Sequence, residues 1–401
     1  MHCTRKIKED LYFIGSEDRR LNLFENMFPI PNGVSYNSYL LVDEKTVLLD
    51  TVDYSVGKQF LENLDYVLNG RNLDYLIINH MEPDHSSIIK TIVKKFPNVT
   101  IIGNMQTIKM LKQFFEFNEE PNIQIVKEND VLNTGNHILR FIFAPMVHWP
   151  EVMFTYDETS KMLFSADAFG TFGALNGNIF NDDTNFEKEY LDEARRYYTN
   201  IVGKYGMQVQ NVFKKLENTE IKMICPLHGP IWRNNLPYIL DKYDKWSKYL
   251  PEEKSIIILY SSVYGNTENL ANIVANKLAE NGIKNLKVYD VSNTDNSILL
   301  SESFRCSHIV LLSTTYNMGI FPKMKEYISD IKRMNLQNRT FAIIENSTWS
   351  PGISNKIRDK IQEMQNMTIL DDFFAIKSSL KSDQTECLNS FVNNIVEDFN
   401  K

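Results

Sequence analysis

The sequence contains few cysteines, and they are widely spaced. Cys3, Cys225, Cys306 and Cys387 are the only four in 401 residues, and no C-x-x-C pair occurs. This spacing excludes a redox C-x-x-C motif and a built-in iron centre held by four cysteines. We therefore expect the thiols to be buried or inert, and any metal site to use other ligands.

Long apolar runs and an excess of basic charge are also missing. No run approaches the length of a membrane span, and no apolar segment of signal-peptide length follows Met1–Lys6. The 51 Asp and Glu outnumber the 43 Lys and Arg, giving a net charge of −8, which disfavours non-specific nucleic-acid binding. We expect a globular cytoplasmic protein that binds neither membrane nor nucleic acid.

Two parts of the chain differ in their hydrophobic pattern. The first part combines short β-rich runs (37–42, 46–50, 139–144 and 161–166) with helical stretches (87–95, 107–117 and about 185–216). After a polar stretch near 246–254, strands (256–260, 286–290, 308–313 and 340–345) alternate with helices (267–280, 322–333 and 353–364). We expect a mixed α/β domain over 1–250 and a doubly wound parallel sheet over 255–401.

A phosphate-binding turn is predicted at the start of the second domain. The expected strand 256–260 is followed by Ser261-Ser262-Val263-Tyr264-Gly265-Asn266-Thr267-Glu268 and then by helical spacing of apolar residues. Backbone N–H groups and the helix dipole at such a turn attract anions. The turn matches neither the Walker lysine motif nor G-x-G-x-x-G, so we expect neutral donors to hold a monophosphate.

Two later loops in the same domain are suited to a flat heteroaromatic ring. They read Thr314-Thr315-Tyr316-Asn317-Met318-Gly319 and Asn346-Ser347-Thr348-Trp349-Ser350-Pro351-Gly352, each after an expected strand. In a doubly wound sheet the loops after the strands line one crevice. Small polar residues and an aromatic side chain there provide edge hydrogen bonds and stacking.

A cluster of metal-ligand types occurs in the first domain. Asn79-His80-Met81-Glu82-Pro83-Asp84-His85 places two histidines and two carboxylates directly after the apolar run 75–78. Because Pro83 lies within it, we expect a loop at a strand end rather than a helix. Such a loop can direct its side chains to one point, although a polar surface turn is an equally frequent meaning of a short cluster taken alone.

Three further candidates follow other predicted strands of this domain, namely His148, Asp167 and His228. A lone histidine at such a position is more often a core residue, but four of the seven histidines lie at strand ends here. Seven groups exceed the three protein ligands of a catalytic zinc. Two metals fit better, with Asp167 as a possible bridge, and imidazoles with carboxylates suit iron, manganese or zinc.

The motifs of both domains together resemble a known family. S-S-V-Y-G-N-T-E at 261–268 and S-T-T-Y-N-M-G at 313–319 resemble flavodoxin-like FMN domains. H-x-E-x-D-H at 80–85, followed by the three later candidates, resembles the metallo-β-lactamase-like αββα sandwich, with glutamate where the hydrolases usually carry histidine. The combination is similar to flavodiiron proteins, also called A-type flavoproteins.

The resemblance implies FMN and two iron ions as cofactors. By that resemblance His80, Glu82 and His148 bind one iron, Asp84, His85 and His228 bind the other, Asp167 bridges them, and Tyr197 donates a hydrogen bond to a bound ligand. The implied FMN contacts are Ser262, Val263, Gly265, Asn266, Thr267, Thr314, Thr315, Tyr316, Asn317, Gly319, Asn346, Ser347, Thr348 and Trp349.

The resemblance further implies an oxidoreductase that reduces dioxygen to water, nitric oxide to nitrous oxide, or both, and so detoxifies these gases. The implied partners are an external electron donor, either rubredoxin or a reduced deazaflavin, and a second copy of the chain in a head-to-tail dimer or a dimer of dimers. Two alternatives stay open: a dizinc hydrolase with an idle flavin domain, and a non-catalytic flavin and gas sensor.

Overall fold

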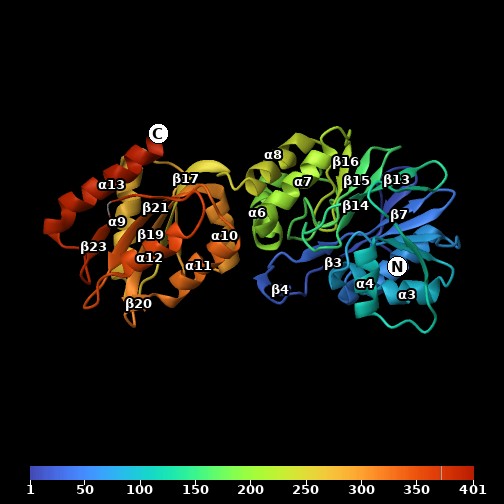
Figure 1. The fold of residues 1–401 in the computed structure, drawn as a ribbon, viewed down its shortest axis with the longest axis horizontal. Coiled ribbons are helices and arrows are strands. Elements are labelled where there is room, and N and C mark those ends of the chain that lie inside the picture. The colour runs from blue at the N-terminus through green and yellow to red at the C-terminus, as the bar shows by residue number, and fades with distance from the viewer. Residues whose placement is uncertain (372) are drawn as a thin grey trace. The chain divides into compact units, whose positions relative to one another are not determined.

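The computed structural model describes residues 1–371 and 373–401. The chain forms two units: the first comprises Met1–Tyr198 and Met207–Tyr243, and the second comprises Thr199–Gly206 and Asp244–Lys401. Figure 1 traces the chain through both units.

Two β-sheets form the centre of the first unit. The order of the larger sheet is β1 (Arg5–Lys6), β2 (Leu11–Phe13), β7 (Tyr39–Val42), β8 (Thr46–Leu49), β9 (Tyr75–Ile77), β10 (Thr100–Gly103) and β11 (Asn122–Ile125). The order of the smaller sheet is β12 (Val131–Asn133), β13 (Ile138–Phe143), β14 (Met153–Asp157), β15 (Met162–Phe164) and β16 (Met223–Cys225). Both mix parallel and antiparallel pairs, and β8–β9–β10 and β15–β16 are parallel.

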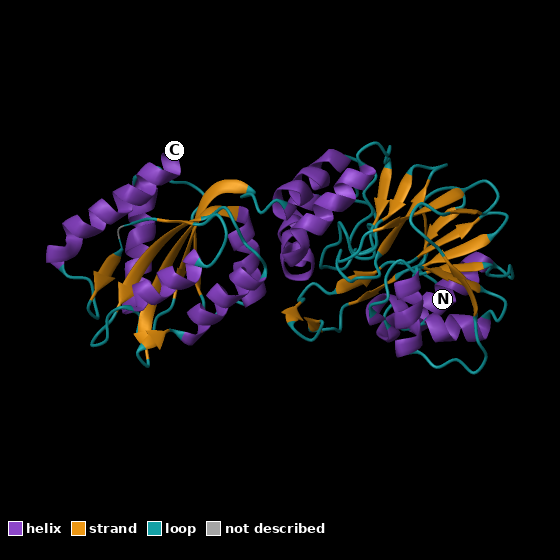
Figure 2. Ribbon diagram, in the orientation of Figure 1, coloured by secondary structure: helices purple, strands orange, loops and turns teal. Residues whose placement is uncertain are grey.

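The two sheets share one apolar core. Side chains of the larger sheet, such as Leu41 and Ile77, are buried in the same cluster as Phe141, Met153 and Phe164 of the smaller sheet. Helices lie on the outer sides of the paired sheets, as Figure 2 shows for the first unit: η1 (Tyr54–Val56), α1 (Gly57–Leu68), α2 (Pro83–Ser86), α3 (Ile89–Lys95), α4 (Met105–Phe114), α5 (Phe186–Glu189), α6 (Leu191–Tyr197), α7 (Gly206–Leu216) and α8 (Leu236–Ser247). Two small ribbons complete it: β3 (Ser16–Asp18) with β6 (Val34–Tyr36), and β4 (Leu23–Phe24) with β5 (Phe28–Pro29). This is the expected αββα sandwich.

The second unit is a parallel sheet with helices on both faces. Its strand order is β18 (Lys287–Asp290), β17 (Glu253–Tyr260), β19 (Cys306–Tyr316), β21 (Thr340–Asn346) and β22 (Thr368–Ile369), while β23 (Phe374–Ile376) also pairs with β21 and β20 (Gly319–Ile320) pairs antiparallel with β19. The helices are α9 (Asn266–Glu280), α10 (Asn296–Arg305), α11 (Pro322–Arg333), α12 (Ile353–Gln362) and α13 (Thr385–Asn400), with the short turn η4 (Ser382–Gln384). Since the order 2-1-3-4 reverses direction beside β17, the ligand crevice of such a sheet lies after β17 and β19.

Three local predictions were wrong. The expected long helix over about 185–216 is instead interrupted after Tyr197 by a π-helix, Tyr198–Val202, and a 3₁₀ turn, Gly203–Tyr205. The expected loop at 80–85 contains one helical turn, Pro83–Ser86, because proline is accepted at the first helical position. Strand β19 continues to Tyr316, where it pairs with β20, so Thr314 and Thr315 are strand residues.

The four cysteines are all free thiols and differ in exposure. Cys225 and Cys306 are buried, whereas Cys3 and Cys387 are exposed. Within the described part of the chain, no helix combines the length and the apolar character needed to cross a membrane.

Candidate metal centre

The first ligand segment begins where β9 ends. Asp50, which follows β8, accepts hydrogen bonds from the backbone N–H groups of Asn79 at 2.7 Å and His80 at 3.1 Å, and from the side-chain amide of Asn79 at 2.7 Å. The chain is thereby held as it leaves the sheet, with His80 turned inward. The helical turn that starts at Pro83 then carries Asp84 and His85 to the same side.

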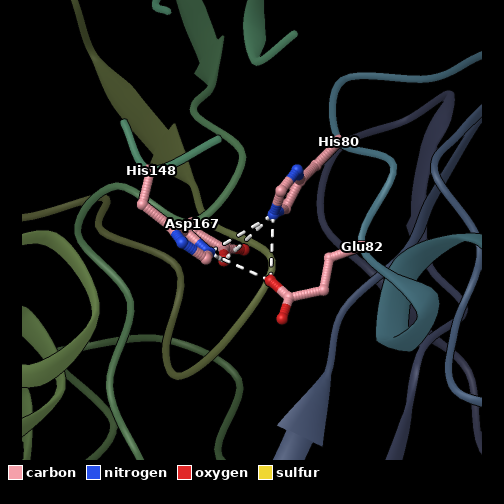
Figure 3. A group of neighbouring side chains, drawn as sticks. All are labelled: His80, Glu82, His148 and Asp167. Carbon is pink, nitrogen blue, oxygen red and sulfur yellow. Dashed lines mark hydrogen bonds and ion pairs between the residues drawn. The ribbon is translucent and has the colours of Figure 1, made fainter. Parts of the chain in front are cut away.

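The other ligand candidates come from the smaller sheet. His148 follows β13, Asp167 follows β15 and His228 follows β16. Figure 3 shows His80 and Glu82 approaching from one side, and His148 and Asp167 from the other. The seven side chains form two groups whose ligand atoms lie within 4.8 Å of one another: His80, Glu82, His148 and Asp167, and Asp84, His85 and His228.

The first group is closely spaced around imidazole nitrogens. The Nε2 atoms of His80 and His148 are 3.4 Å apart, and Glu82 Oε2 lies 3.2 Å from the former and 3.0 Å from the latter. All of these residues are buried. Two ligand atoms each about 2.1 Å from an ion and at right angles are about 3.0 Å apart, so the spacing suits coordination of one metal.

The ligand atoms of the second group are as closely spaced as those of the first. The Nε2 atoms of His85 and His228 are 3.0 Å apart, and Asp84 Oδ2 lies 3.4 Å from His85 and 3.2 Å from His228. Neither oxygen of Asp84 has a hydrogen-bond partner among the described residues, although both are buried. Burying a carboxylate whose oxygens accept no hydrogen bond is costly, so the position of Asp84 beside two imidazoles indicates a cation site. His85 belongs to this group by position.

Asp167 faces both groups, one oxygen toward each. Its Oδ2 lies 3.0 Å from His148 Nε2 and 3.6 Å from His80 Nε2, whereas its Oδ1 lies 3.1 Å from His85 Nε2 and 3.9 Å from His228 Nε2. A carboxylate placed in this way can bridge two metals. The donor set and the converging atoms therefore fit a dinuclear centre.

The ionisable groups of the centre change one another's pKa values. Burial alone would lower the pKa of His148, but its hydrogen bonds to Asp167 and Glu82 raise that pKa to about 9. Burial would raise the pKa of Asp167, yet the charges of His85 and His80 hold it well below its usual range. The imidazoles thus balance the carboxylates as cations do, and a metal ion takes the place of their protons when it binds.

An aromatic cluster covers the second group. The ring of Tyr197 lies 5.5 Å from that of His228, and the ring of Phe24 lies 5.4 Å from it. Phe172 contacts both aromatic residues. The Tyr197 hydroxyl is fully buried and has no hydrogen-bond partner in the described ranges. Burying a hydroxyl without a hydrogen-bond partner is costly, which sets this tyrosine apart from a simply packed aromatic residue.

Two supporting carboxylates were missed from the sequence. Glu151 accepts hydrogen bonds from His80 Nδ1 and from the backbone N–H of Met81, each at 2.8 Å, and Asp50 holds the ligand segment as described above. Each was signalled by an acidic residue next to an apolar strand, in Val47-Leu48-Leu49-Asp50 and in Glu151-Val152-Met153-Phe154. At the hairpin tip beside the centre, burial and the carboxylate of Glu82 raise the pKa of Glu25 to about 8.

In the second unit, three segments meet at the carboxyl ends of the parallel strands. The side-chain amide of Asn346, at the end of β21, donates to the hydroxyl of Thr267 at 3.0 Å. The Thr314 N–H donates to the Ser261 hydroxyl at 3.3 Å, and the Thr315 hydroxyl donates to the Ser350 carbonyl at 3.0 Å. The predicted phosphate turn and both ring-facing segments are thus brought together.

The phosphate turn has the geometry of an anion site. Gly265 precedes the 15-residue helix α9 with φ of +89°, and its N–H donates to the Ser262 hydroxyl at 3.0 Å. Aromatic side chains nearby are open to solvent, with Tyr316 46% and Trp349 72% exposed. Exposed aromatic rings beside a cradle of N–H and hydroxyl groups fit a flat ligand that carries a phosphate.

Both units match known protein families. Residues 34–229 match the family model described as ODP family beta lactamase, and residues 258–391 match the flavodoxin model. The chain is 32% identical over 344 residues to an anaerobic nitric oxide reductase flavorubredoxin of Vibrio vulnificus, covering 84% of this chain and 69% of the relative.

Solved structures are similar over nearly the whole chain. The rubredoxin oxygen:oxidoreductase of Desulfovibrio gigas superposes with a TM-score of 0.90 at 26% identity, covering 99% of this chain and 98% of that one. The flavodiiron protein of Giardia intestinalis has the same fold, with a TM-score of 0.91, 23% identity and coverage of 99% and 96%.

Fold and site therefore define an oxidoreductase in which a metallo-β-lactamase-like domain precedes a flavodoxin-like domain. The chain belongs to the flavodiiron protein family, whose cofactors are FMN and a diiron centre.

Proposed function

We propose that this chain reduces dioxygen to water, nitric oxide to nitrous oxide, or both, at its diiron centre with electrons from FMN. The observation that carries the proposal is the placement of Asp167 between two ligand groups. It provides two adjacent metal positions, and both gas reactions require several electrons at one place. The names of the relatives, a nitric oxide reductase and an oxygen oxidoreductase, point to the same two substrates.

The proposed iron ligands follow the two groups. His80, Glu82 and His148 would hold one ion, and Asp84, His85 and His228 the other, with Asp167 shared. With FMN bound, two ferrous ions and the reduced flavin would together supply the four electrons that, with four protons, reduce one dioxygen to two waters. Two electrons and two protons would suffice to convert two nitric oxide molecules to nitrous oxide and water. The cofactors carry that chemistry, and the chain supplies position and surroundings.

The chain's own side chains shape the space around a bound gas. The ligand imidazoles are all buried, which keeps bulk water away from the metals. The Tyr197 hydroxyl, which lacks a partner within the described residues, would donate a hydrogen bond to a bound molecule. Burial raises the pKa of this phenol well above its usual value, so the hydroxyl keeps its proton and remains a donor.

The proposed FMN site uses the three segments that meet in the second unit. Ser262, Val263, Gly265, Asn266 and Thr267 would hold the phosphate, because the first three lie in the turn before α9 and the last two are the first residues of that helix. The isoalloxazine ring would be contacted by Thr314, Thr315, Tyr316, Asn317, Gly319, Asn346, Ser347, Thr348 and Trp349. The hydrogen bonds that link Thr267, Thr314 and Thr315 to other segments support a single shared site.

We further propose domains of 1–250 and 255–401, an external electron donor such as rubredoxin or a reduced deazaflavin, and a head-to-tail homodimer or a dimer of dimers. The last boundary between the two units, between Tyr243 and Asp244, lies close to the proposed domain boundary. The separate cores of the two units support a modular chain. Sedimentation of the purified protein tests the assembly.

Anaerobic reduction of the FMN, followed by stopped-flow mixing with dioxygen or with nitric oxide, tests the activity. The proposal predicts rapid flavin reoxidation with at least one gas and sustained consumption when a donor is present. A large difference in rate assigns the preferred substrate. Zinc instead of iron, together with hydrolysis of an ester or a lactam, would indicate a dizinc hydrolase, and a single reoxidation without turnover would indicate a sensor.

A further inference from the structure

Three histidines of the metal centre differ in the hydrogen-bond partner of Nδ1, the ring nitrogen that faces away from the ligand group. His80 donates its Nδ1–H to Oε1 of Glu151 at 2.8 Å, so a carboxylate supports this imidazole from the side opposite to its metal-facing Nε2. His228 donates its Nδ1–H to the carbonyl oxygen of Ser35 at 2.7 Å. The Nδ1 atom of His85 has no hydrogen-bond partner in the described parts of the chain. A histidine of the first ligand group therefore donates to a carboxylate, whereas neither histidine of the second group does.

Glu151 is fixed so that its charge acts mainly on His80. Its side chain is fully buried, and the accepting Oε1 also takes the backbone N–H of Met81 at 2.8 Å. Its other oxygen, Oε2, has no hydrogen-bond partner among the described residues. Asn104 anchors the backbone by donating to the Glu151 carbonyl at 2.6 Å. Among the described residues, the groups that donate to this carboxylate are thus the His80 imidazole and the Met81 N–H, and only the imidazole can carry a charge.

A carboxylate behind a metal-binding histidine has two effects. It fixes the tautomer in which Nε2 presents its lone pair to the metal, and it makes that nitrogen a stronger donor. Extra negative charge also favours the more highly charged, oxidised state of a nearby metal. A backbone carbonyl fixes the tautomer of His228 but adds no net charge.

We propose that Glu151 is a positioning residue that makes the two iron positions unequal: the ion held by His80, Glu82 and His148 binds more tightly and has a lower reduction potential than the ion held by Asp84, His85 and His228. This inference rests on the proposed diiron site and extends it. It predicts that iron leaves one position before the other, and that electrons enter the second position first.

Iron release from the wild-type holoprotein is the first test. Under anaerobic reducing conditions with an excess of ferrous chelator, absorbance should show two phases of one iron each, with clearly separate rates. Samples enriched in ⁵⁷Fe and frozen between the phases should have lost one of two Mössbauer quadrupole doublets. Release of both ions in one phase would overturn the proposal.

The variant Glu151→Gln separates charge from orientation, because the amide oxygen can still accept from His80 and Met81. We expect the slow phase to accelerate about 10- to 100-fold, with little change in the fast phase. The reduction potential of the retained iron should rise. Glu151→Asp, which keeps the charge, should return both values toward wild type. Equal acceleration of both phases, or an unchanged slow phase, would contradict the proposal.

A second buried histidine–carboxylate pair in the same unit provides a matched control. Asp157 accepts from His137 Nδ1 at 2.7 Å and is 1% exposed, but neither residue belongs to the ligand groups. Asp157→Asn should lower stability and leave both release phases and the iron potentials unchanged. If it changed the slow phase as much as Glu151→Gln does, a general loss of packing would explain the effect and the inference would fail.

The outcomes also separate this inference from the proposed function. A protein that binds two irons, releases them in equal phases and reduces gas would keep the function and lose the inference. A protein that releases them in unequal phases without any gas reduction would do the reverse. One metal ion per chain would remove both.

Discussion

Asp167 is the residue on which the two halves of the metal centre meet. It is 1% exposed, and its two oxygens approach histidines of different groups. Such a residue has no substitute in the chain, because every other ligand candidate lies in one group only. A single substitution at Asp167 can therefore test whether the two metal positions depend on a shared ligand.

Asp167→Asn should lower gas reduction by more than about 100-fold, since an amide is a poor bridging ligand. The visible spectrum of bound FMN should be unchanged, because the substitution lies in the other unit. Gas consumption and flavin absorbance measure the two effects. Asp182→Asn, at a more exposed ion pair with Arg233, is the control that should change neither. Loss of FMN with iron retained would contradict the assignment of the units.

His137 is a buried cation between two carboxylates and lies outside the metal centre. Its Nδ1 is 2.7 Å from Asp157 and its Nε2 is 2.8 Å from Asp10. The hydrogen bond to Asp157 raises the pKa of His137 to about 9, despite the opposing effect of burial. Since the folded pKa exceeds the unfolded value near 6.5, this stabilisation is complete below about pH 6.5 and is lost as the pH rises through about 9.

The difference in unfolding free energy between wild type and His137→Gln should therefore shrink between about pH 7 and pH 10. Asp10 is partly exposed, so solvent screening reduces the effect to on the order of 1–2 kcal/mol. Denaturant unfolding at a series of pH values measures it. A difference that stays constant over this range would show that the charge of His137 does not contribute to stability.

At the scale of elements, the turn between β17 and α9 depends on a left-handed backbone position. Gly265 has φ of +89°, a conformation that costs a residue with a side chain about 1–2 kcal/mol. No atom lies within 4 Å of the position a Cβ would take, so the strain would come from the backbone alone.

Gly265→Ala should therefore weaken FMN binding about tenfold, because alanine shifts the free turn away from the left-handed conformation and binding would have to restore it. Titration of the apoflavoprotein, followed by flavin fluorescence, gives the dissociation constant. Gly282→Ala is a matched control, because Gly282 has φ of +86° and an equally open surrounding but lies after the carboxyl end of α9. The control should lose similar stability and keep its affinity for FMN. Equal weakening in both variants would argue against a role for the turn.

A buried arginine joins several elements of the second unit. Arg339 is 1% exposed and donates to the carbonyls of Ser303, Phe304 and Tyr249 at 2.7–2.8 Å. It thus ties the end of α10 and the segment after α8 to the start of β21. Burial lowers the pKa of this guanidinium to about 9.

Arg339→Met should lower the unfolding free energy of the second unit by on the order of 3 kcal/mol, because several buried carbonyls would lose their donor. Loss of the flavin signal in denaturant reports this unit. The exposed Arg333, which pairs with Asp330 on α11, offers the control Arg333→Met, for which we expect a change below about 1 kcal/mol. Equal effects would contradict a structural role for burial at Arg339.

At the scale of the whole molecule, each unit has its own apolar core. One cluster joins the two sheets of the first unit, and another lies between the parallel sheet and the helices α9 and α13 of the second. The ligand groups for metal belong to the first unit and the phosphate turn to the second. Each cofactor should therefore stabilise mainly the unit that holds it.

Calorimetry should show this separation. Removal of iron by a chelator should lower the midpoint of one unfolding transition by on the order of 10 °C and leave the other nearly unchanged, whereas removal of FMN should do the opposite. The control is restoration of each midpoint by adding back the same cofactor. A single transition that shifts as a whole with either cofactor would show that the two units unfold together.

Much of the fold was predictable because local patterns and tertiary structure agree. The predicted strands and helices after residue 255 correspond to observed elements, and α11 has the predicted bounds, but the helices α10 and α13 were missed. The interruption after Tyr197 was not predictable, because an apolar-periodic helix and one containing a π-helical turn have the same sequence pattern. Glu151 was missed because an acidic residue next to an apolar strand is only a weak signal, and its contact with His80 joins residues 71 positions apart.

The sequence by itself determined the two-domain order, the ligand types and the segments in which they occur, because strand ends and turns are encoded by nearby residues. The grouping of the ligands and the bridging position of Asp167 were implied by the family resemblance, but only the tertiary structure gave the distances between these atoms and placed Glu151 beside Nδ1 of His80. These relations join residues as far apart as His85 and His228, and such distances depend on how two sheets pack against each other. Packing of that kind is a property of the folded chain, not of any local stretch.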